Sequence, residues 1–304
     1  CSSSITTSPK PVTGASAAGC VNTATTSVTV VTNPTVTVNT ATFCIGASAT
    51  LTANGAVTYV WSPATGLSST TGASVTANPT VTTTYTITGT AGTCTTVGTT
   101  TVTVNPLPVV TVNSGTICIN NSTTLNAGGA STYTWSPGTG LSSANGSPVT
   151  ATPTTTTAYT VTGTDANGCV NTETTTVTVN PLPTLALTSG FICNGSTATL
   201  TASGASTYSW SPATGLSSTT GSSVTGTPAS TTQYTVTGTD ANGCVDSDTT
   251  SITVVNNPTV TVASATICIN SSTTLSATGA QTYVWTPGTG LSSTTGSSVT
   301  ANPT

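Results

Sequence analysis

The chain has 304 residues and a formal net charge of −4, which comes from one basic residue, Lys10, and five acidic ones, and it has neither His nor Met. Acid–base catalysis, nucleophilic catalysis and transition-metal binding need clustered titratable or thiolate groups, so we expect neither an enzyme nor a cofactor or metal. Nothing in the chain can neutralise phosphates, and no apolar run approaches the roughly 18 residues of a spanning helix, so nucleic acid and membrane insertion are not expected.

Residues 1–34 contain two runs of alternating residues, separated by the turn sequence SAAG. The run VTGASAAGC closely matches VTGTDANGC at residues 161–169, and TTSVTVVTNP continues it. Alternation of period two is typical of β-strands. We therefore expect the last two strands of a repeating module here, without the rest of the module.

Residues 35–106, 107–181 and 182–258 are predicted to be three complete modules of about 75 residues. Trp residues recur every 74 or 75 positions, and each opens a stretch such as WSPATGLSSTTG. Within a module, short alternating runs are bounded by Gly, Asn or Pro, and about seven strands fit. Repetition at such a period indicates tandem units, and the pattern predicts an immunoglobulin-like sandwich.

The aromatic residues follow the repeat and are predicted to lie in the core. Trp as a ligand platform is the alternative, but one Trp per module within a strand pattern favours packing. The predicted core aromatics are Trp61, Trp135, Trp210, Trp285, Tyr85, Tyr159 and Tyr234.

Residues 259–304 are predicted to be a partial module that lacks its last two strands. A sandwich in this state exposes core and an open strand edge. Two explanations remain open. Residues 1–34 of one subunit complete residues 259–304 of its neighbour by strand donation, or the 304 residues are a window from a longer repetitive chain. The sequence TSPKP around Lys10, in place of TTAYT, favours a true end.

Short Pro-containing junctions separate the modules, and such linkers are stiff. The junctions contain Pro34, Pro106, Pro181 and Pro258. The fold class that we predict is therefore all-β, with tandem immunoglobulin-like β-sandwich modules of about 75 residues in a linear rod.

Eight of the nine cysteines form two series. The corner cysteines precede the second expected strand and are Cys44, Cys118, Cys193 and Cys268. The hairpin cysteines follow the sixth and are Cys20, Cys94, Cys169 and Cys244. Two regular cysteines in a small module indicate disulfides in an oxidising compartment, whereas metal binding would need closer clustering. Cys1 lies outside the repeat and is a lipid-bearing residue, a bond to another chain or an incidental thiol.

The connectivity does not follow from spacing. Our default pairs cysteines within a module: Cys44–Cys94, Cys118–Cys169, Cys193–Cys244, and Cys20 with Cys268 of a neighbouring subunit. The alternative starts from immunoglobulin topology, in which the two series lie at opposite poles of a module. A corner cysteine then faces the hairpin cysteine of the next module, which gives Cys44–Cys169 and Cys118–Cys244.

The strings TYTVTGTDANGC, CINNS and WSPATGLSS resemble the immunoglobulin-like or PKD-like repeats of Bacteroidota cell-surface and gliding-motility adhesins. The resemblance covers nearly the whole chain. It implies export through the type IX secretion route, a cell-surface or extracellular location, and a role in attachment, gliding or fibre formation. It transfers no catalytic residues.

The function that we expect is an extracellular structural protein, a fibre or adhesin stalk, whose partner is itself in a head-to-tail homopolymer. The alternative is a set of repeated carbohydrate- or surface-binding adhesin modules from a longer chain, with the SPATGLSSTTG loop as the binding face. Ice binding through rows of Thr is a weaker hypothesis. Asp165 and Asp240 each supply one carboxylate to a turn, which suits a turn cap better than a calcium site.

Overall fold

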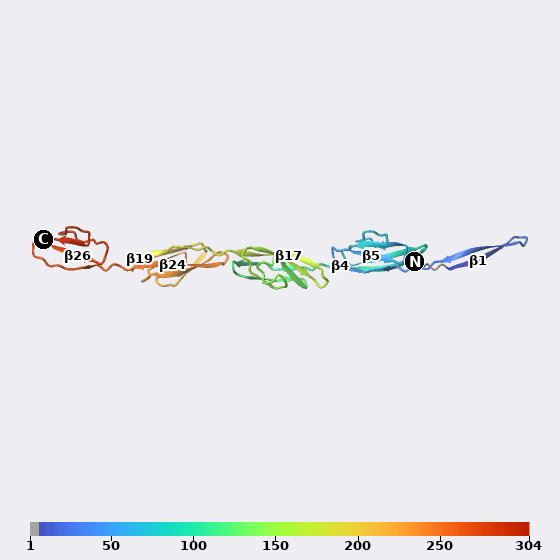
Figure 1. Ribbon diagram of the computed structural model, residues 1–304, viewed down its shortest axis with the longest axis horizontal. Helices are drawn as coiled ribbons and strands as arrows, with labels where there is room; N and C mark the ends of the chain where they lie inside the picture. The colour runs from blue at the N-terminus through green and yellow to red at the C-terminus, as the bar shows by residue number, and fades with distance from the viewer. Residues whose placement is uncertain (1–5, 304) are drawn as a thin grey trace. The chain divides into compact units, whose positions relative to one another are not determined.

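The computed structural model describes residues 6–303, and the regular elements among them are β-strands (Figure 1). The chain divides into two compact units, residues 1–179 and 180–304, and each is described by itself. Among the described residues there is no helix with the length and apolar character to cross a membrane. Thr, Val and Ile dominate the strands, and β-branched residues favour extended backbone.

Module 35–106 folds into two facing sheets. One sheet has the order β3-β5-β7 and the other β4-β9-β8-β6, in which β4 runs parallel to β9. The strands are β3 (Thr37–Val38), β4 (Ala41–Cys44), β5 (Ala49–Asn54), β6 (Thr58–Ser62), β7 (Ser74–Ala77), β8 (Thr83–Ala91) and β9 (Cys94–Asn105). This division of the strands between two sheets is that of an immunoglobulin-like sandwich.

Modules 107–181 and 182–258 repeat this plan. In the first, the larger sheet has the order β11-β17-β16-β14, and the smaller one is split into the pairs β10-β13 and β12-β15. In the second, the sheets are β18-β20-β22 and β19-β24-β23-β21. The strands are β10 (Thr111–Val112), β11 (Gly115–Cys118), β12 (Thr123–Leu125), β13 (Ala127–Gly128), β14 (Thr132–Ser136), β15 (Val149–Ala151), β16 (Thr157–Thr164), β17 (Val170–Asn180), β18 (Ala186–Leu187), β19 (Gly190–Cys193), β20 (Ala198–Ser203), β21 (Thr207–Ser211), β22 (Ser223–Gly226), β23 (Thr232–Thr239) and β24 (Val245–Val255).

Each complete module has its own apolar core between the two sheets. In module 35–106 the core holds Leu51, Trp61, Tyr85, Ile87 and Val102, all of which are buried. Alternate residues of each strand face this core, while the intervening Thr and Ser residues face solvent. The prediction of tandem immunoglobulin-like sandwich modules is confirmed.

The first half of each module differs from the expectation in one respect. The corner cysteines were expected to precede the second strand of a module, but Cys44 is the last residue of β4, which is itself the second strand, and Trp61 therefore lies on the fourth strand, β6. After β3 the chain crosses over and continues as β4 in the opposite sheet. This change of sheet carries the corner cysteine Cys44 to the end of β4, beside β9.

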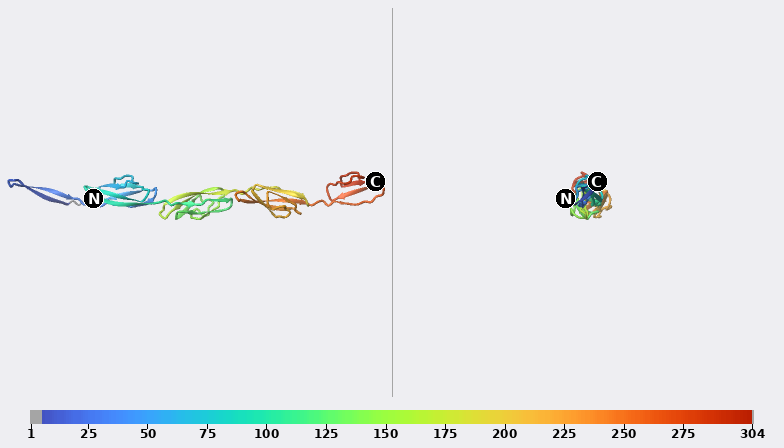
Figure 2. Two further views of the ribbon diagram at one scale, coloured as in Figure 1. Left: turned by 180° about the vertical axis from the view of Figure 1, so that it is seen from behind. Right: turned by 90° about the vertical axis from the view of Figure 1, so that its right-hand side faces the viewer.

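The described residues of the two remaining segments form fewer strands than a complete module. Strands β1 (Thr6–Ala15) and β2 (Val21–Val30) form a two-stranded antiparallel hairpin (Figure 2). In residues 259–303, strands β25 (Thr261–Val262), β26 (Thr273–Thr278) and β27 (Ser298–Ala301) form one three-stranded sheet. This sheet matches β18-β20-β22, whereas the described residues of the segment form no counterpart of the four-stranded sheet.

Candidate assembly site

The hairpin β1–β2 has the same strand register as the last hairpin of a complete module. Ala15 lies opposite Val21 next to the turn, as Thr164 lies opposite Val170 in β16 and β17. The Ser16 N–H donates to the carbonyl of Cys20 at 2.8 Å, and the Asp165 N–H donates to that of Cys169 at 2.9 Å. When Cys20 is aligned with Cys169, residue 12 before the cysteine corresponds to residue 161, and residue 28 after it corresponds to residue 177 of module 107–181.

The apolar residues of this hairpin are exposed, although their counterparts are in a core. Val12 is 61% exposed and Val28 is 55% exposed, while Val161 and Val177 are fully buried at 0%. In module 182–258 the corresponding residues, Val236 and Ile252, are also fully buried. The hairpin therefore presents a face whose equivalent packs inside a sandwich. Val21 points the other way and corresponds to the exposed Val170.

Gly14 marks a place of close approach. Apart from Gly14 and its two chain neighbours, no described residue has an atom within 4 Å of the position that a Cβ on Gly14 would occupy. At the corresponding Gly163, a Cβ would lie 2.7 Å from Val110 and 2.8 Å from Ala130. A side chain at this position is therefore compatible with the free hairpin but not with a complete sandwich. Sequence reasoning missed this residue, although Gly inside a strand often indicates close contact with another segment.

A threonine on β2 is also exposed in the hairpin, although its counterparts in complete modules are buried. In the three complete modules a buried Thr hydroxyl on the last strand donates to a backbone carbonyl near the first strand: Thr100 to Asn39, Thr175 to Asn113 and Thr250 to Thr188, at 2.8–2.9 Å. The residue at this position in the hairpin is Thr26, which is exposed. By the same alignment, the matching carbonyl in residues 259–303 is that of Ala263.

The described residues 259–303 form no counterparts of the two strands that the hairpin resembles. In module 182–258, β23 and β24 lie in the middle of the sheet, between β19 and β21. In the part of the chain that the structure describes, no strand pairs with the counterparts of β19 and β21, residues 265–268 and 282–286. Trp285 and Leu275 are consequently only half-buried, whereas Trp210 and Leu200 are buried. The predicted core position of Trp285 is thus open on one side.

Three residues of the hairpin depart from the repeat. Pro9, Lys10 and Pro11 stand where module 107–181 has Ala158, Tyr159 and Thr160. The ladder between β14 and β16 ends at the pair Ser136 and Thr160. If the hairpin formed the same ladder in a completed module, Pro9 would lie beyond its end. Pro11 would be in the last residue pair, so it would remove at most one terminal hydrogen bond. Prolines on a free strand edge also oppose unspecific pairing with other strands.

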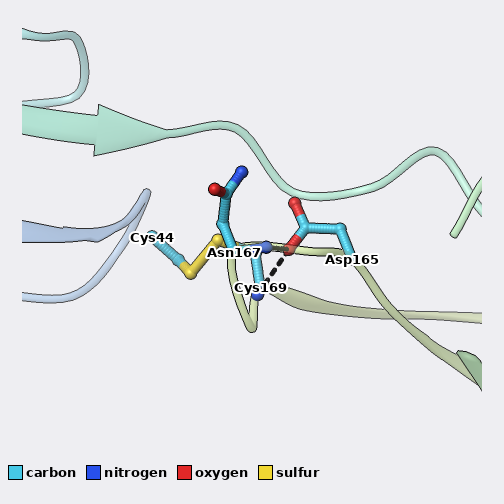
Figure 3. The surroundings of a disulfide bond; sticks show 4 residues. All are labelled: Cys44, Asp165, Asn167 and Cys169. Carbon is cyan, nitrogen blue, oxygen red and sulfur yellow. Dashed lines mark hydrogen bonds between the residues drawn. A yellow bond between two sulfur atoms is a disulfide. The ribbon is translucent and has the colours of Figure 1, made fainter. Parts of the chain in front are cut away.

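The structure joins Cys44 to Cys169, with Cα atoms 5.5 Å apart (Figure 3). This is the alternative pairing, and the default pairs Cys44–Cys94 and Cys118–Cys169 are wrong. Cys44 lies opposite Asn105 in the parallel ladder of β4 and β9, and Cys94 is at the other end of this 12-residue strand. At about 3.3 Å per residue, Cys44 and Cys94 are about 36 Å apart, far beyond the reach of a disulfide.

The same geometry overturns the default pair Cys193–Cys244. Cys193 lies opposite Val255 at the end of β24, whereas Cys244 precedes the first residue of that strand. Cys193 is a free thiol, while Cys118 and Cys244 are both disulfide-bonded. The pair Cys20–Cys268 would join two copies of the chain and stays a prediction that one chain does not test. Cys1 lies outside the described residues.

The carboxylates Asp165 and Asp240 cap the hairpin turns. The N–H groups of Asn167 and Cys169 donate to Asp165 Oδ1, each at 2.8 Å (Figure 3). Asp240 receives the equivalent bonds, and the one from Cys244 is the main reason why its pKa lies below the ordinary value. In β1–β2 the Ser16 hydroxyl takes this place and accepts from the Cys20 N–H at 3.3 Å. The prediction that the Asp side chains cap turns is confirmed.

The other predicted core aromatics are buried. Trp61, Trp135 and Trp210 are nearly inaccessible, and so are Tyr85, Tyr159 and Tyr234. Each of these three tyrosines donates its hydroxyl to a backbone carbonyl of the loop after the Trp: Tyr85 to Thr65, Tyr159 to Thr139 and Tyr234 to Thr214. Burial raises the pKa of all three.

The loop that was the candidate binding face uses its hydroxyls internally. Ser68 Oγ accepts from the Thr76 N–H, and Ser69 Oγ donates to the carbonyl of Thr71. A shallow cleft beside the loop is lined by Ser48, Gly66, Leu67, Ser68, Thr76 and Asn78. Among residues 6–303, no group of three or more His, Cys, Asp or Glu side chains could hold a metal ion.

Comparison with known proteins agrees with the fold. The family described as "Ig-like domain CHU_C associated" matches residues 181–258. No curated protein matches the chain.

Several solved structures also resemble the chain. A variant of titin domains I67–I69 with Glu-to-Ala mutations is 12% identical, covers 74% of this chain and 99% of its own, and has a TM-score of 0.40. A calcium-stabilised adhesin with which an Antarctic bacterium binds ice is 16% identical, covers 81% of each chain, and has a TM-score of 0.34. Domains 3–5 of Drosophila OTK are 9% identical, cover 73% of this chain and 95% of their own, and score 0.32. Scores this low carry no functional argument. The chain is an Ig-like repeat protein, as its two-sheet modules and the family match to residues 181–258 establish.

Proposed function

We propose that the chain is a structural component of an extracellular fibre or adhesin stalk, and that its copies join by strand donation. In each joint, the hairpin of residues 1–34 of one copy enters module 259–304 of the next copy and completes it. The observation that carries the proposal is the match between β1–β2 and the hairpin of a complete module, in register, turn and apolar face.

The complete modules define how the hairpin would fit. In module 182–258, Gly190 of β19 lies opposite Ile252, and Trp210 of β21 lies opposite Val236. By the same register, Ala265 would lie opposite Val28, and Trp285 opposite Val12. Insertion would bury both valines, at about 25 cal/mol for each Å² of apolar surface removed from water. It would also bring Thr26 to the carbonyl of Ala263.

An extracellular location fits the remaining observations. The Cys44–Cys169 disulfide requires an oxidising compartment. Lys10 is followed by Pro11, so a protease that cleaves after basic residues has almost no site in the chain. The resemblance to Bacteroidota surface adhesins further supports export by the type IX route.

The test is the assembly state of the purified 304-residue chain, measured by light scattering and electron microscopy. We expect head-to-tail oligomers or filaments. Gly14→Val should prevent assembly, because its side chain would collide with Val260 and Ala280, the counterparts of Val110 and Ala130. Val28→Asp should also prevent it, because it places a charge in the core.

Two matched variants are the controls. Ala15→Thr introduces the residue that complete modules have at this position, and Val21→Asp changes a residue whose counterparts are exposed. Both should assemble like the wild type. A wild-type chain that stays monomeric at all concentrations would refute strand donation, and so would a Gly14→Val variant that assembles normally.

A further inference from the structure

We propose that two disulfides cross every joint between copies: Cys193 of one copy with Cys20 of the next, and Cys268 of the first copy with Cys94 of the next. This inference rests on the strand donation proposed above and adds its covalent chemistry. It replaces the earlier prediction of a single bond between Cys20 and Cys268.

The Cys44–Cys169 bond supplies the rule for pairing. Cys44 is the corner cysteine of module 35–106, and Cys169 is the hairpin cysteine of the module that follows it. A corner cysteine is at the end of the strand parallel to the module's last strand, so it lies at the pole that faces the next module. A hairpin cysteine precedes or begins the last strand, so it lies at the pole that faces the previous module.

Within the described residues, the free thiols are those that this rule leaves without a partner in the same chain. They are Cys20, Cys94, Cys193 and Cys268. Two of them belong to the corner series and two to the hairpin series. Their surroundings differ from those of the bonded cysteines in a consistent way: the hairpin cysteines Cys169 and Cys244 are fully buried, whereas Cys94 is half-buried and Cys20 is exposed.

The corner series shows the same difference. The bonded Cys44 and Cys118 are half-buried, whereas Cys193 and Cys268 are exposed. Each free thiol is thus more exposed than the bonded cysteines of its own series, although the half-buried Cys94 still donates to the carbonyl of Val31 at 3.6 Å. The backbone hydrogen bonds of the Cys20 turn match those around Cys169, so the Cys20 side chain is attached at the same place in its turn.

Strand donation brings these four thiols into two pairs. A completed module consists of residues 259–304 of one copy and the hairpin of the next, so its corner cysteine is Cys268 and its hairpin cysteine is Cys20. Module 182–258 precedes it, and its corner cysteine is Cys193, which therefore meets Cys20. Module 35–106 of the second copy follows it, and its hairpin cysteine is Cys94, which therefore meets Cys268.

A bond between Cys20 and Cys268 would have to cross a completed module. Cys268 would lie opposite residue 31 in the register of β19 and β24, at the far end of the strand from Cys20. The two cysteines would be separated by about 36 Å, since strands rise about 3.3 Å per residue. This is the geometry that excludes Cys44–Cys94.

Each bond forms by oxidation of two thiols. Two S–H bonds break and one S–S bond forms, with release of two protons and two electrons to a disulfide oxidant. With oxidised glutathione as the oxidant, its S–S bond breaks and it leaves as two molecules of reduced glutathione. The bonds would make the assembled joint resistant to SDS until a reductant is added.

The first experiment assembles the chain with oxidised glutathione and maps disulfide-linked peptides after pepsin digestion. We expect the pairs Cys20–Cys193 and Cys94–Cys268. If filaments form but the four cysteines stay reduced, or if Cys20–Cys268 is found, this inference is wrong while strand donation stands. If no filaments form, strand donation itself fails.

Double variants give a second readout on SDS gels without reductant. Cys20→Ser with Cys193→Ser removes both members of one proposed bond, so the ladder of oligomers should persist through Cys94–Cys268. Cys20→Ser with Cys268→Ser breaks both bonds, so filaments should fall apart to monomers in SDS. A loss of the ladder in both double variants would instead indicate the bond Cys20–Cys268 and would overturn the inference.

Discussion

The indole N–H of Trp61 donates a hydrogen bond to the carbonyl of Gly72 at 2.9 Å, and both groups lie in the same module. The equivalent bond recurs in the other modules, from Trp135 to Gly146, Trp210 to Gly221 and Trp285 to Gly296. Each Trp thereby fixes the path of the SPATGLSSTTG loop as well as filling the core. This explains why the loop sequence and the Trp recur together.

Replacing Trp61 by Phe should destabilise module 35–106 by about 1–3 kcal/mol, because the carbonyl of Gly72 loses its donor. Hydrogen exchange of the full chain, followed by mass spectrometry, reports the loss in peptides of this module. Trp285→Phe is the matched control when both changes are made in the monomeric Gly14→Val variant: the Trp285 bond is exposed in the free chain, so the change should cost less. Equal costs at the two positions would contradict this role of burial.

The turn at Asp240 should weaken in acid. Backbone N–H groups, chiefly that of Cys244, lower the pKa of this carboxyl below its ordinary value of 3.8. A lowered pKa in the folded state means that the carboxylate contributes stability above the unfolded value, and that this contribution is lost as the pH falls through the folded value. Denaturation by urea at pH 6 and pH 2.5 should therefore differ more in the wild type than in Asp240→Asn, which keeps an acceptor oxygen but does not titrate. The same acid sensitivity in both proteins would refute the assignment.

Ionisation of the core tyrosines should destabilise the complete modules at high pH. Burial raises the pKa of Tyr85 above its ordinary value of 10.0, and its hydroxyl donates to the carbonyl of Thr65 at 2.6 Å. Because the folded state favours the neutral hydroxyl, the contribution of Tyr85 to stability is fully present below its unfolded pKa of about 10. This contribution is lost as the pH rises through its higher pKa in the folded state. Absorbance at 295 nm should show Tyr85, Tyr159 and Tyr234 ionising late, together with loss of structure.

The variant Tyr85→Phe separates the two effects of this hydroxyl. It should cost about 1 kcal/mol at pH 7, because the carbonyl of Thr65 loses its partner. It should also make module 35–106 less sensitive to alkali, since no group remains there to ionise in the core. An unchanged alkaline transition in this module would contradict the prediction.

Lys10 offers a direct probe of hairpin insertion. It stands where complete modules have their core Tyr, and in the free hairpin it is exposed. Acetylation of its amine should therefore be at least about ten times slower in assembled filaments than in the monomeric Gly14→Val variant, because insertion packs the methylene stem of Lys10 against module 259–304 and leaves the amine at the edge of the joint, where the reagent has less access. Equal rates in the two samples would place Lys10 outside the joint.

Much of this protein follows from its sequence. Alternation of Thr with Val, Leu and Ile predicted the strands and their buried faces, and Gly in the turns predicted hairpins that the structure contains, with Gly168 at a φ of 80°. The core positions of Trp61 and Tyr85 followed from their period. These features depend on neighbours along the chain, or on the repeat, and so they can be read from a sequence.

The disulfide connectivity depended on the tertiary structure. Spacing left open both Cys44–Cys94, which was our default, and Cys44–Cys169, because it does not tell which end of a strand faces which neighbour. Only the parallel pairing of β4 with β9 places Cys44 at one pole of the module and Cys94 at the other. The contrast between the exposed Val28 and the buried Val177 also needed the fold, because burial is decided by whether a second sheet packs on the strand, and the two strands are almost alike in sequence.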